Sequence, residues 1–188
     1  MNRIQKISRY LNFFFNALLI IIPLCVIFQW LFIDTVPIKN LLKYEFLQPP
    51  VSTPEGYVNL GAVQWSILAK IIGFISQCVK FIPLYLSLFV LRSIFLNYKK
   101  EVIFSTMNAC YYNYLGWLFF LDALIAQPLS NLLIVLATTL SNPPGHRYIT
   151  VGFGTPNLEA IFCGVLVIVI SWIMLEASKI QDEQSFTI

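Results

Sequence analysis

Four apolar segments, each long enough to cross a bilayer, constrain this chain more than any other feature. They extend over residues 10–33, 64–96, 106–140 and 158–178. A spanning helix needs about 20 predominantly apolar residues. With 58% hydrophobic and 11% charged residues, the chain lies far from soluble proteins, in which about a quarter of residues are charged. The sequence therefore predicts an all-α membrane protein, one domain over residues 1–188, with four transmembrane helices in a bundle.

The distribution of Lys and Arg predicts the orientation of the chain. With the N-terminus inside, the inner segments hold seven basic residues and the outer segments three: Arg3, Lys6, Arg9, Arg92, Lys99, Lys100 and Lys179 against Lys39, Lys43 and Arg147. Basic residues favour the cytoplasmic side of a membrane. We therefore expect both termini to be cytoplasmic, together with the inner turn 97–105 and the tail 179–188. The segments 34–63 and 141–157 are then outer loops.

Both outer loops contain a short segment with the character of a strand. Residues 44–47 form one, and residues 148–153 alternate between side-chain types in the manner of the other. These segments predict a short β-hairpin or strand pair outside the membrane.

Each of the two central apolar segments carries one charged residue near its middle, Lys80 in the first and Asp122 in the second. At about 1.5 Å per residue, both charges fall near the midplane of a hydrocarbon layer about 30 Å thick. An unpaired charge at that depth costs at least about 2.5 to 3.5 kcal/mol. We therefore predict an intramembrane ion pair between Lys80 and Asp122.

Uncharged polar residues recur at helical spacing beside these two charges and predict a polar interior: Ser76, Gln77, Gln127 and Ser130. Small and polar residues allow spanning helices to approach one another closely. Such an interior serves either as a structural core that fixes helix register or as a site for transport or sensing of a small ligand or proton. The two halves of the chain lack the internal repeat that is typical of transporters.

Several classes of protein are disfavoured by what the sequence lacks. The four cysteines have no metal-ligand spacing, and His146 is the only histidine, so no metal or cofactor is expected. A nucleophile beside a base, which enzymatic hydrolysis needs, is not evident either. The net charge of +3 is dispersed along the chain, which disfavours direct nucleic-acid binding. We expect a non-enzymatic protein embedded in a lipid bilayer.

Two segments of the chain carry a recognisable pattern. The first includes Lys100, Phe104, Ser105, Asn108 and Gly116, and the second includes Glu176, Asp182, Glu183, Phe186, Thr187 and Ile188. Together they resemble the family called domain of unknown function 2975, and the likeness extends over nearly the whole chain. In that family a K-G-E-x-F-S-x-x-N loop joins the second and third of four helices, and an acidic E-x-x-L-T-I pattern ends the chain. Two departures stand out: Lys100-Glu101-Val102 lacks a glycine, which predicts a looser or longer turn, and Phe186 replaces leucine.

The resemblance implies a small four-helix protein of the bacterial inner membrane, without an established activity. Family members are often encoded beside small helix-turn-helix regulators. Our first functional hypothesis is therefore a regulatory or signalling partner, which binds such a regulator or another protein through its cytoplasmic turn and tail. The alternative is a small-molecule or ion transporter or sensor that uses Lys80 and Asp122.

A stripe of small residues leaves the oligomeric state open. Gly164, Ser171 and Ser178 recur at seven-residue spacing in the fourth predicted helix. The stripe can face either a neighbouring helix of the same chain or a second copy.

Overall fold

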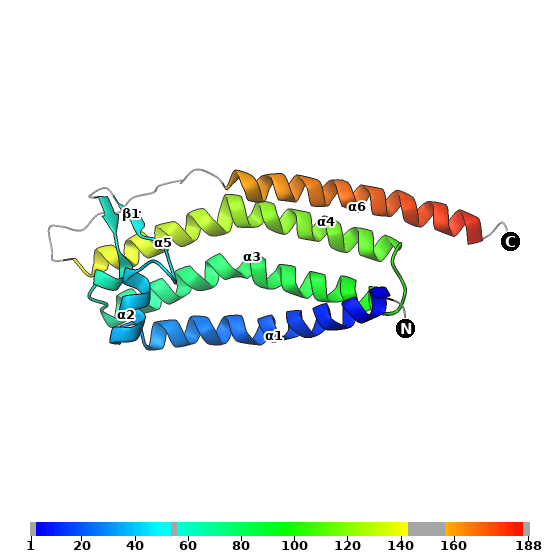
Figure 1. Cartoon of the computed structure of the whole chain (residues 1–188). Helices are drawn as coiled ribbons and strands as arrows, with labels where there is room; N and C mark the ends of the chain where they lie inside the picture. The colour runs from blue at the N-terminus through cyan, green and yellow to red at the C-terminus, as the bar shows by residue number, and fades with distance from the viewer. Residues whose placement is uncertain (1–2, 54–55, 143–156, 186–188) are drawn as a thin grey trace. The chain divides into compact units, whose positions relative to one another are not determined.

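The computed structural model describes residues 3–53, 56–142 and 157–185. Its elements are α1 (Arg3–Leu31), α2 (Val36–Lys43), β1 (Val51–Thr53), β2 (Gly56–Val58), η1 (Leu60–Ala62), α3 (Ile67–Lys99), α4 (Thr106–Leu121), η2 (Asp122–Ala126), α5 (Gln127–Leu140) and α6 (Leu158–Ser185) (Figure 1). In this part of the chain, four helical stretches are long and apolar enough to cross a membrane: Arg3–Leu31, Ile67–Lys99, Thr106–Leu140 and Leu158–Gln184. The predicted class, an all-α membrane protein with a short strand pair, is confirmed.

The ends of the spanning helices differ in part from the prediction. The first helix begins at Arg3 instead of residue 10, and the last continues to Ser185 instead of residue 178. Apolarity marks only the part of a helix that lies in lipid, whereas Lys, Arg, Gln and Glu are good helix formers that extend it into water. The last helix therefore includes most of the predicted polar tail. The helix α3 likewise continues to Lys99, past its predicted end at residue 96, so the inner turn is shorter than predicted. The third stretch begins at Thr106, as predicted.

The first outer loop folds into α2, a two-stranded hairpin and η1. The expected strand at residues 44–47 is wrong, because Tyr44 follows α2 and Glu45 has a φ of 62°. Ile38 and Leu42 lie four residues apart and are both buried, so this segment buries an apolar stripe as a helix. The observed sheet is antiparallel and pairs Val51 with Val58. The other expected strand, at 148–153, lies outside the described residues.

The chain divides into two compact units. Unit 1 comprises Met1–Ile21, Ile82–Ile125 and Pro156–Ile188, and unit 2 comprises Ile22–Phe81 and Ala126–Thr155. Three helical stretches contribute residues to both units, and each has a proline near the border. Pro23 lies inside α1, Pro83 lies inside α3, and the π-helical turn η2 precedes Pro128. Proline lacks a backbone N–H and so removes one hydrogen bond from the helix around it. The expectation of a single domain stays a prediction.

The core of unit 2 joins the spanning helices to the outer loop. Its buried residues come from α1, α2, η1, α3 and α5 and include Val26, Trp30, Ile33, Ile38, Leu42, Leu60, Val63, Trp65, Ala69, Ile134 and Ala137. The indole N–H of Trp65 donates to the carbonyl oxygen of Leu60 at 3.3 Å. Residues 34–63 are thus anchored by apolar burial and by a hydrogen bond from the Trp65 side chain.

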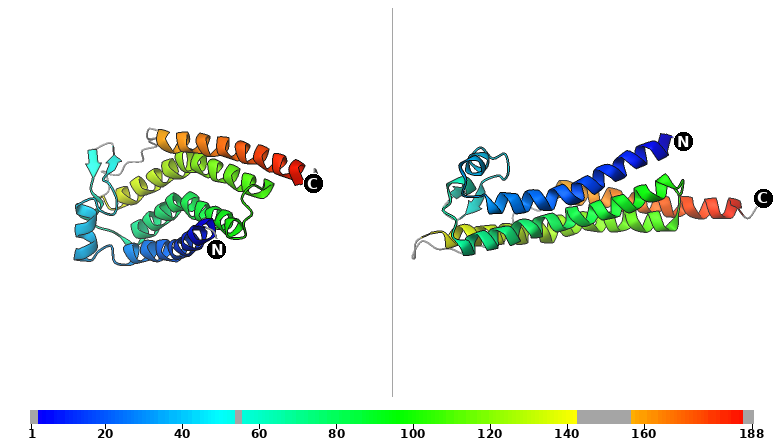
Figure 2. Two further views of the ribbon diagram at one scale, coloured as in Figure 1. Left: turned by 45° about the vertical axis from the view of Figure 1, so that its right-hand side comes forward. Right: turned by 90° about the horizontal axis from the view of Figure 1, so that it is seen from below.

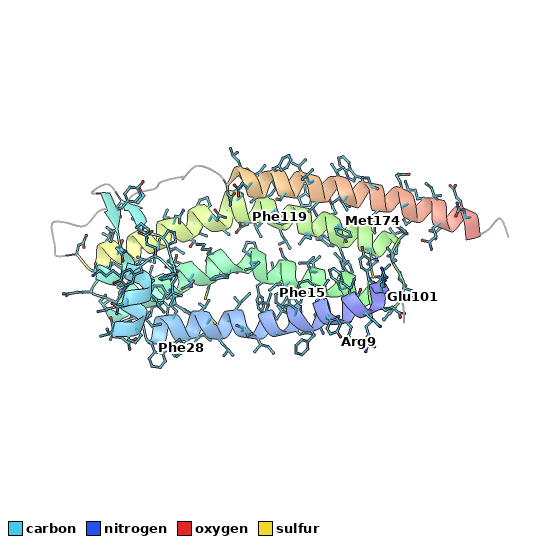
Figure 3. The ribbon with its side chains drawn as sticks, viewed as in Figure 1. Arg9, Phe15, Phe28, Glu101, Phe119 and Met174 are labelled. Atoms are coloured by element: carbon cyan, nitrogen blue, oxygen red, sulfur yellow. The ribbon has the colours of Figure 1, made fainter. Side chains whose placement is uncertain are left out.

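Unit 1 is built around the close packing of α4 on α6, which lie side by side (Figure 2). A second contact joins α1 to α3 within this unit, where the rings of Phe15 and Phe95 lie 5.6 Å apart. Ile94, next to Phe95, is fully buried. The turn between α3 and α4, which carries Glu101, also belongs to this unit (Figure 3).

Candidate functional site

Two of the predicted interior residues meet in unit 2. Ser76 of α3 donates its hydroxyl to the carbonyl oxygen of Ser130 on α5 at 2.7 Å, and the two hydroxyl oxygens lie 3.0 Å apart. Both side chains are buried. Small hydroxyl residues here satisfy each other between spanning helices, which is how such residues support helix association in membranes.

Gln77 is the centre of a second buried polar contact, which we call the amide relay: Trp30, Gln77 and Gln29. The indole N–H of Trp30 donates to Oε1 of Gln77. Nε2 of Gln77 donates in turn to Oε1 of Gln29 at 2.9 Å. Gln77 was predicted as an interior residue from the sequence, whereas its two partners on α1 were not. The sequence nevertheless indicates that Gln29 is an interior residue, because Gln29 is the only strongly polar residue between Ala17 and Ile33.

Gly73 makes room for the amide relay. A Cβ atom at this position would overlap the ring of Trp30. The Trp30 ring also meets Trp65 edge to face, with ring centroids 5.3 Å apart and an interplanar angle of 83°. Trp30 is thus fixed by packing against two residues, and its N–H is aimed at Gln77.

The predicted pair of intramembrane charges is divided between the units. Lys80 lies in the α3 part of unit 2 and its side chain is exposed, whereas Asp122 is the first residue of η2 in unit 1. The pairing of these two residues therefore stays a prediction. Gln127, the fourth predicted interior residue, is half-buried at the start of α5. Near the start of α3, Lys70 forms an ion pair with Asp34.

The inner turn is closed by a hydrogen-bonded cap at the end of α3. Val102 N donates to Asn97 O and Glu101 N donates to Tyr98 O, both at 3.1 Å. This pair of bonds defines a Schellman motif, in which one residue takes the left-handed conformation. Glu101 does so, with a φ of 66°. The expectation of a looser turn in the absence of glycine is therefore wrong, because a glutamate adopts the conformation that glycine adopts more easily.

Asn108 organises the other side of the inner turn. Its side chain is fully buried and donates to Val102 O at 2.9 Å and to Ile103 O at 2.8 Å. It also accepts from Asn97 Nδ2 at 2.7 Å. Ser105 is the N-cap of α4 and accepts from Asn108 N at 3.2 Å, and serine is among the residue types preferred at this position. Ser105 and Asn108 thus have a structural role in this turn.

Gly116 and Gly164 allow the backbones of α4 and α6 to approach closely. A Cβ atom on Gly116 would lie 2.5 Å from Ile168 Cγ1 and 3.0 Å from Gly164 O. Further along the same contact, Ser171 donates to Ala109 O at 2.9 Å. The stripe of small residues on α6 therefore faces α4 of the same chain at Gly164 and Ser171.

The other described residues of the family pattern lie on the surface. Lys100 and Phe104 in the turn are exposed, and so are Glu176, Asp182 and Glu183 on α6. Glu176 accepts from Lys179 at 2.8 Å. Phe186, Thr187 and Ile188 lie outside the described residues. Between residues 3 and 185, as far as the structure describes them, no group of three or more His, Cys, Asp or Glu side chains is placed to hold a metal ion.

These features define a small helical protein with four stretches capable of crossing a membrane and a tightly capped turn between two of them. The chain belongs to the family described as "Protein of unknown function (DUF2975)", whose family model matches residues 50–188. The resemblance seen in the sequence is thereby confirmed from the outer hairpin to the tail. The residues matched by the family model do not include α1 and α2. No curated protein and no solved structure matches the chain at a significant level.

Proposed function

We propose that this protein is a non-enzymatic regulatory partner in the bacterial inner membrane, and that it presents its inner turn and the end of α6 to a cytoplasmic protein. The observation that supports this most is the length of α6. Gly164 lies against Gly116 and Ser171 against Ala109, so the two helices are antiparallel and Met174 is level with the start of α4. The eleven residues from 175 to 185 continue beyond that point, about 16 Å of helix.

The projecting end of α6 has an acidic face with an apolar centre. Glu176, Ile180 and Glu183 follow one another at helical spacing and are all exposed. Asp182 lies beside Glu183 and is exposed as well. A surface of this chemistry suits a basic partner, and small DNA-binding regulators of the helix-turn-helix class carry basic surfaces.

The inner turn supplies a second, preformed surface in the same unit. Phe104 and Met107 are 49% and 59% exposed, and Lys99 and Lys100 are exposed beside them. The Schellman motif and the bonds of Asn108 fix the backbone here, so little conformational entropy would be lost when a partner binds. The excess of basic residues on this side supports a cytoplasmic location, with both termini inside.

The test is photo-crosslinking in native membranes, with a photoreactive amino acid in place of Ile180. Asp182→Lys together with Glu183→Lys reverses the charge of the acidic face, and Glu159→Lys makes a matched change at the opposite end of α6. Exposed charge pairs contribute about 0.2 to 1 kcal/mol each, so losing two of them should lower capture of a basic partner about 2- to 30-fold. Glu159→Lys should leave capture unchanged. Equal capture by all three chains would contradict the proposal.

A second candidate function, sensing or transport of a small ligand or ion, is favoured by one observation. The amide relay and the Ser76–Ser130 contact place buried polar groups inside unit 2. Polar groups within spanning segments often mark sites of function.

A further inference from the structure

The amide relay has a direction, which the indole sets. An indole N–H can only donate a hydrogen bond. Because Trp30 donates to Gln77, the oxygen of the Gln77 amide must face Trp30 and its nitrogen must face Gln29. Oε1 of Gln29 accepts that bond. The amide orientation of Gln29 follows, and its Nε2 is the free end of the relay.

Nε2 of Gln29 is buried and has no hydrogen-bond partner among the residues that the structure describes. The whole residue is 7% exposed, and Gln77 is 6% exposed. A buried amide nitrogen without an acceptor is unfavourable, and such groups are rare in folded proteins. An acceptor oxygen that is not part of the described chain would complete the relay.

The surroundings of Gln29 indicate a neutral acceptor. Val26 and Ile33, about one turn away on either side along the chain, belong to the apolar core of unit 2, and so does Trp30. The nearest basic residue beyond Gln77 on α3 is Lys80, which is exposed. An anion at Gln29 would therefore be buried among apolar core residues, which is unfavourable.

We propose that Gln29 Nε2 is the donor of a binding site for the oxygen of a small neutral molecule inside unit 2. The ligand chemistry is a carbonyl or hydroxyl oxygen, carried by a compound that partitions into the bilayer or by water itself. This inference does not depend on the proposed cytoplasmic partner, since all residues involved belong to unit 2.

Side-chain amide NMR on the full chain in detergent micelles tests the site directly. The Gln29 signal is assigned by its loss in Gln29→Met, or in Gln29→Asn if the first variant does not fold. Two probes of similar shape are titrated: acetophenone, which carries a carbonyl oxygen, and ethylbenzene, which does not. The exposed Gln64 amide is the internal control.

We expect a saturable downfield shift of the Gln29 amide with acetophenone, and no such shift with ethylbenzene or at Gln64. A cross-peak between the Gln29 amide and water that excess acetophenone does not remove would assign the acceptor to water. Gln77→Met should broaden or abolish either signature, because it removes the bond that orients Gln29. An amide that shows neither response, or that shifts equally with both probes, would overturn the proposal.

Discussion

The two units hold their helices together by opposite means. In unit 1, α4 and α6 approach where side chains are absent, at Gly116 and Gly164, and a serine bonds directly to a backbone carbonyl. In unit 2, a large indole, Trp30, fills the space above a single glycine, Gly73, and amides complete the contact. The first contact depends on backbone proximity and the second on the fit of one ring. Unit 2 should therefore be the more sensitive to a single added methyl group.

The largest effect is expected for Gly73→Ala. The added Cβ overlaps the Trp30 ring, which must move and lose its bond to Gln77. Overpacking of this kind costs about 1 to 3 kcal/mol, and we expect the upper end. Unfolding in mixed detergent and SDS micelles, followed by tryptophan fluorescence, measures the change.

Gly164→Ala is the matched variant in unit 1. Its Cβ would meet its nearest neighbours at 3.1 to 3.2 Å, which small shifts can relieve. We expect Gly164→Ala to lower the free energy of unfolding clearly less than Gly73→Ala does. Equal losses would contradict the distinction between the two units.

Asn108→Ala is expected to have the next largest effect. It removes three side-chain hydrogen bonds and leaves the carbonyls of Val102 and Ile103 without this donor, at a cost of about 2 to 3 kcal/mol. Asn113→Ala on the same helix should change the free energy of unfolding by less than about 0.5 kcal/mol. A loss of the same size in both variants would show that the Asn108 bonds are not what stabilises the turn.

The third largest loss of stability is expected when Lys80 or Asp122 is replaced singly. Lys80→Ala or Asp122→Ala should each lower thermal stability by about 1 to 2 kcal/mol if the two charges pair within the membrane. The exchange Lys80→Asp with Asp122→Lys should recover part of the loss. Absence of any recovery in a detergent-solubilised melting experiment would argue against the pair.

The smallest effect, and the only stabilising one, is expected for Glu101→Gly. Glycine adopts the left-handed conformation of residue 101, φ 66°, without the steric cost of a Cβ, which predicts a gain of about 0.5 to 1 kcal/mol. Lys100→Gly, at the preceding residue, whose φ is not positive, should instead lower stability. Thermal melts of both variants distinguish the conformational effect from the loss of a side chain.

The class of fold and the start of α4 could be predicted from the sequence because they depend on local signals. Apolar length marks the spanning helices, and Ser105 stands three residues before Asn108, the spacing of an N-cap bond. The polar contacts of Ser76 and Gln77 were predictable as interior positions, because polar residues in lipid turn toward other helices. Gln29 and Trp30 were missed, since their role depends on which face of α1 meets Gly73.

Other features could not be predicted because long-range packing or competing local chemistry decides them. Residues 44–47 have strand-like composition, but the buried stripe of Ile38 and Leu42 places a helix immediately before them. The left-handed Glu101 is a conformation that its residue type disfavours. Among the family residues, the sequence alone does not separate structural Asn108 and Gly116 from exposed Lys100 and Phe104.

Site-specific labelling tests the central claim that the inner turn and the end of α6 face the cytoplasm. In a chain whose four native cysteines are replaced by alanine, single cysteines are introduced at Lys100, at Gln184 and at Tyr57, which is 80% exposed in the outer hairpin. We predict that a membrane-impermeant maleimide added to intact spheroplasts labels Tyr57→Cys, and labels Lys100→Cys and Gln184→Cys only after permeabilisation. Labelling of residue 100 or 184 from outside would contradict the account.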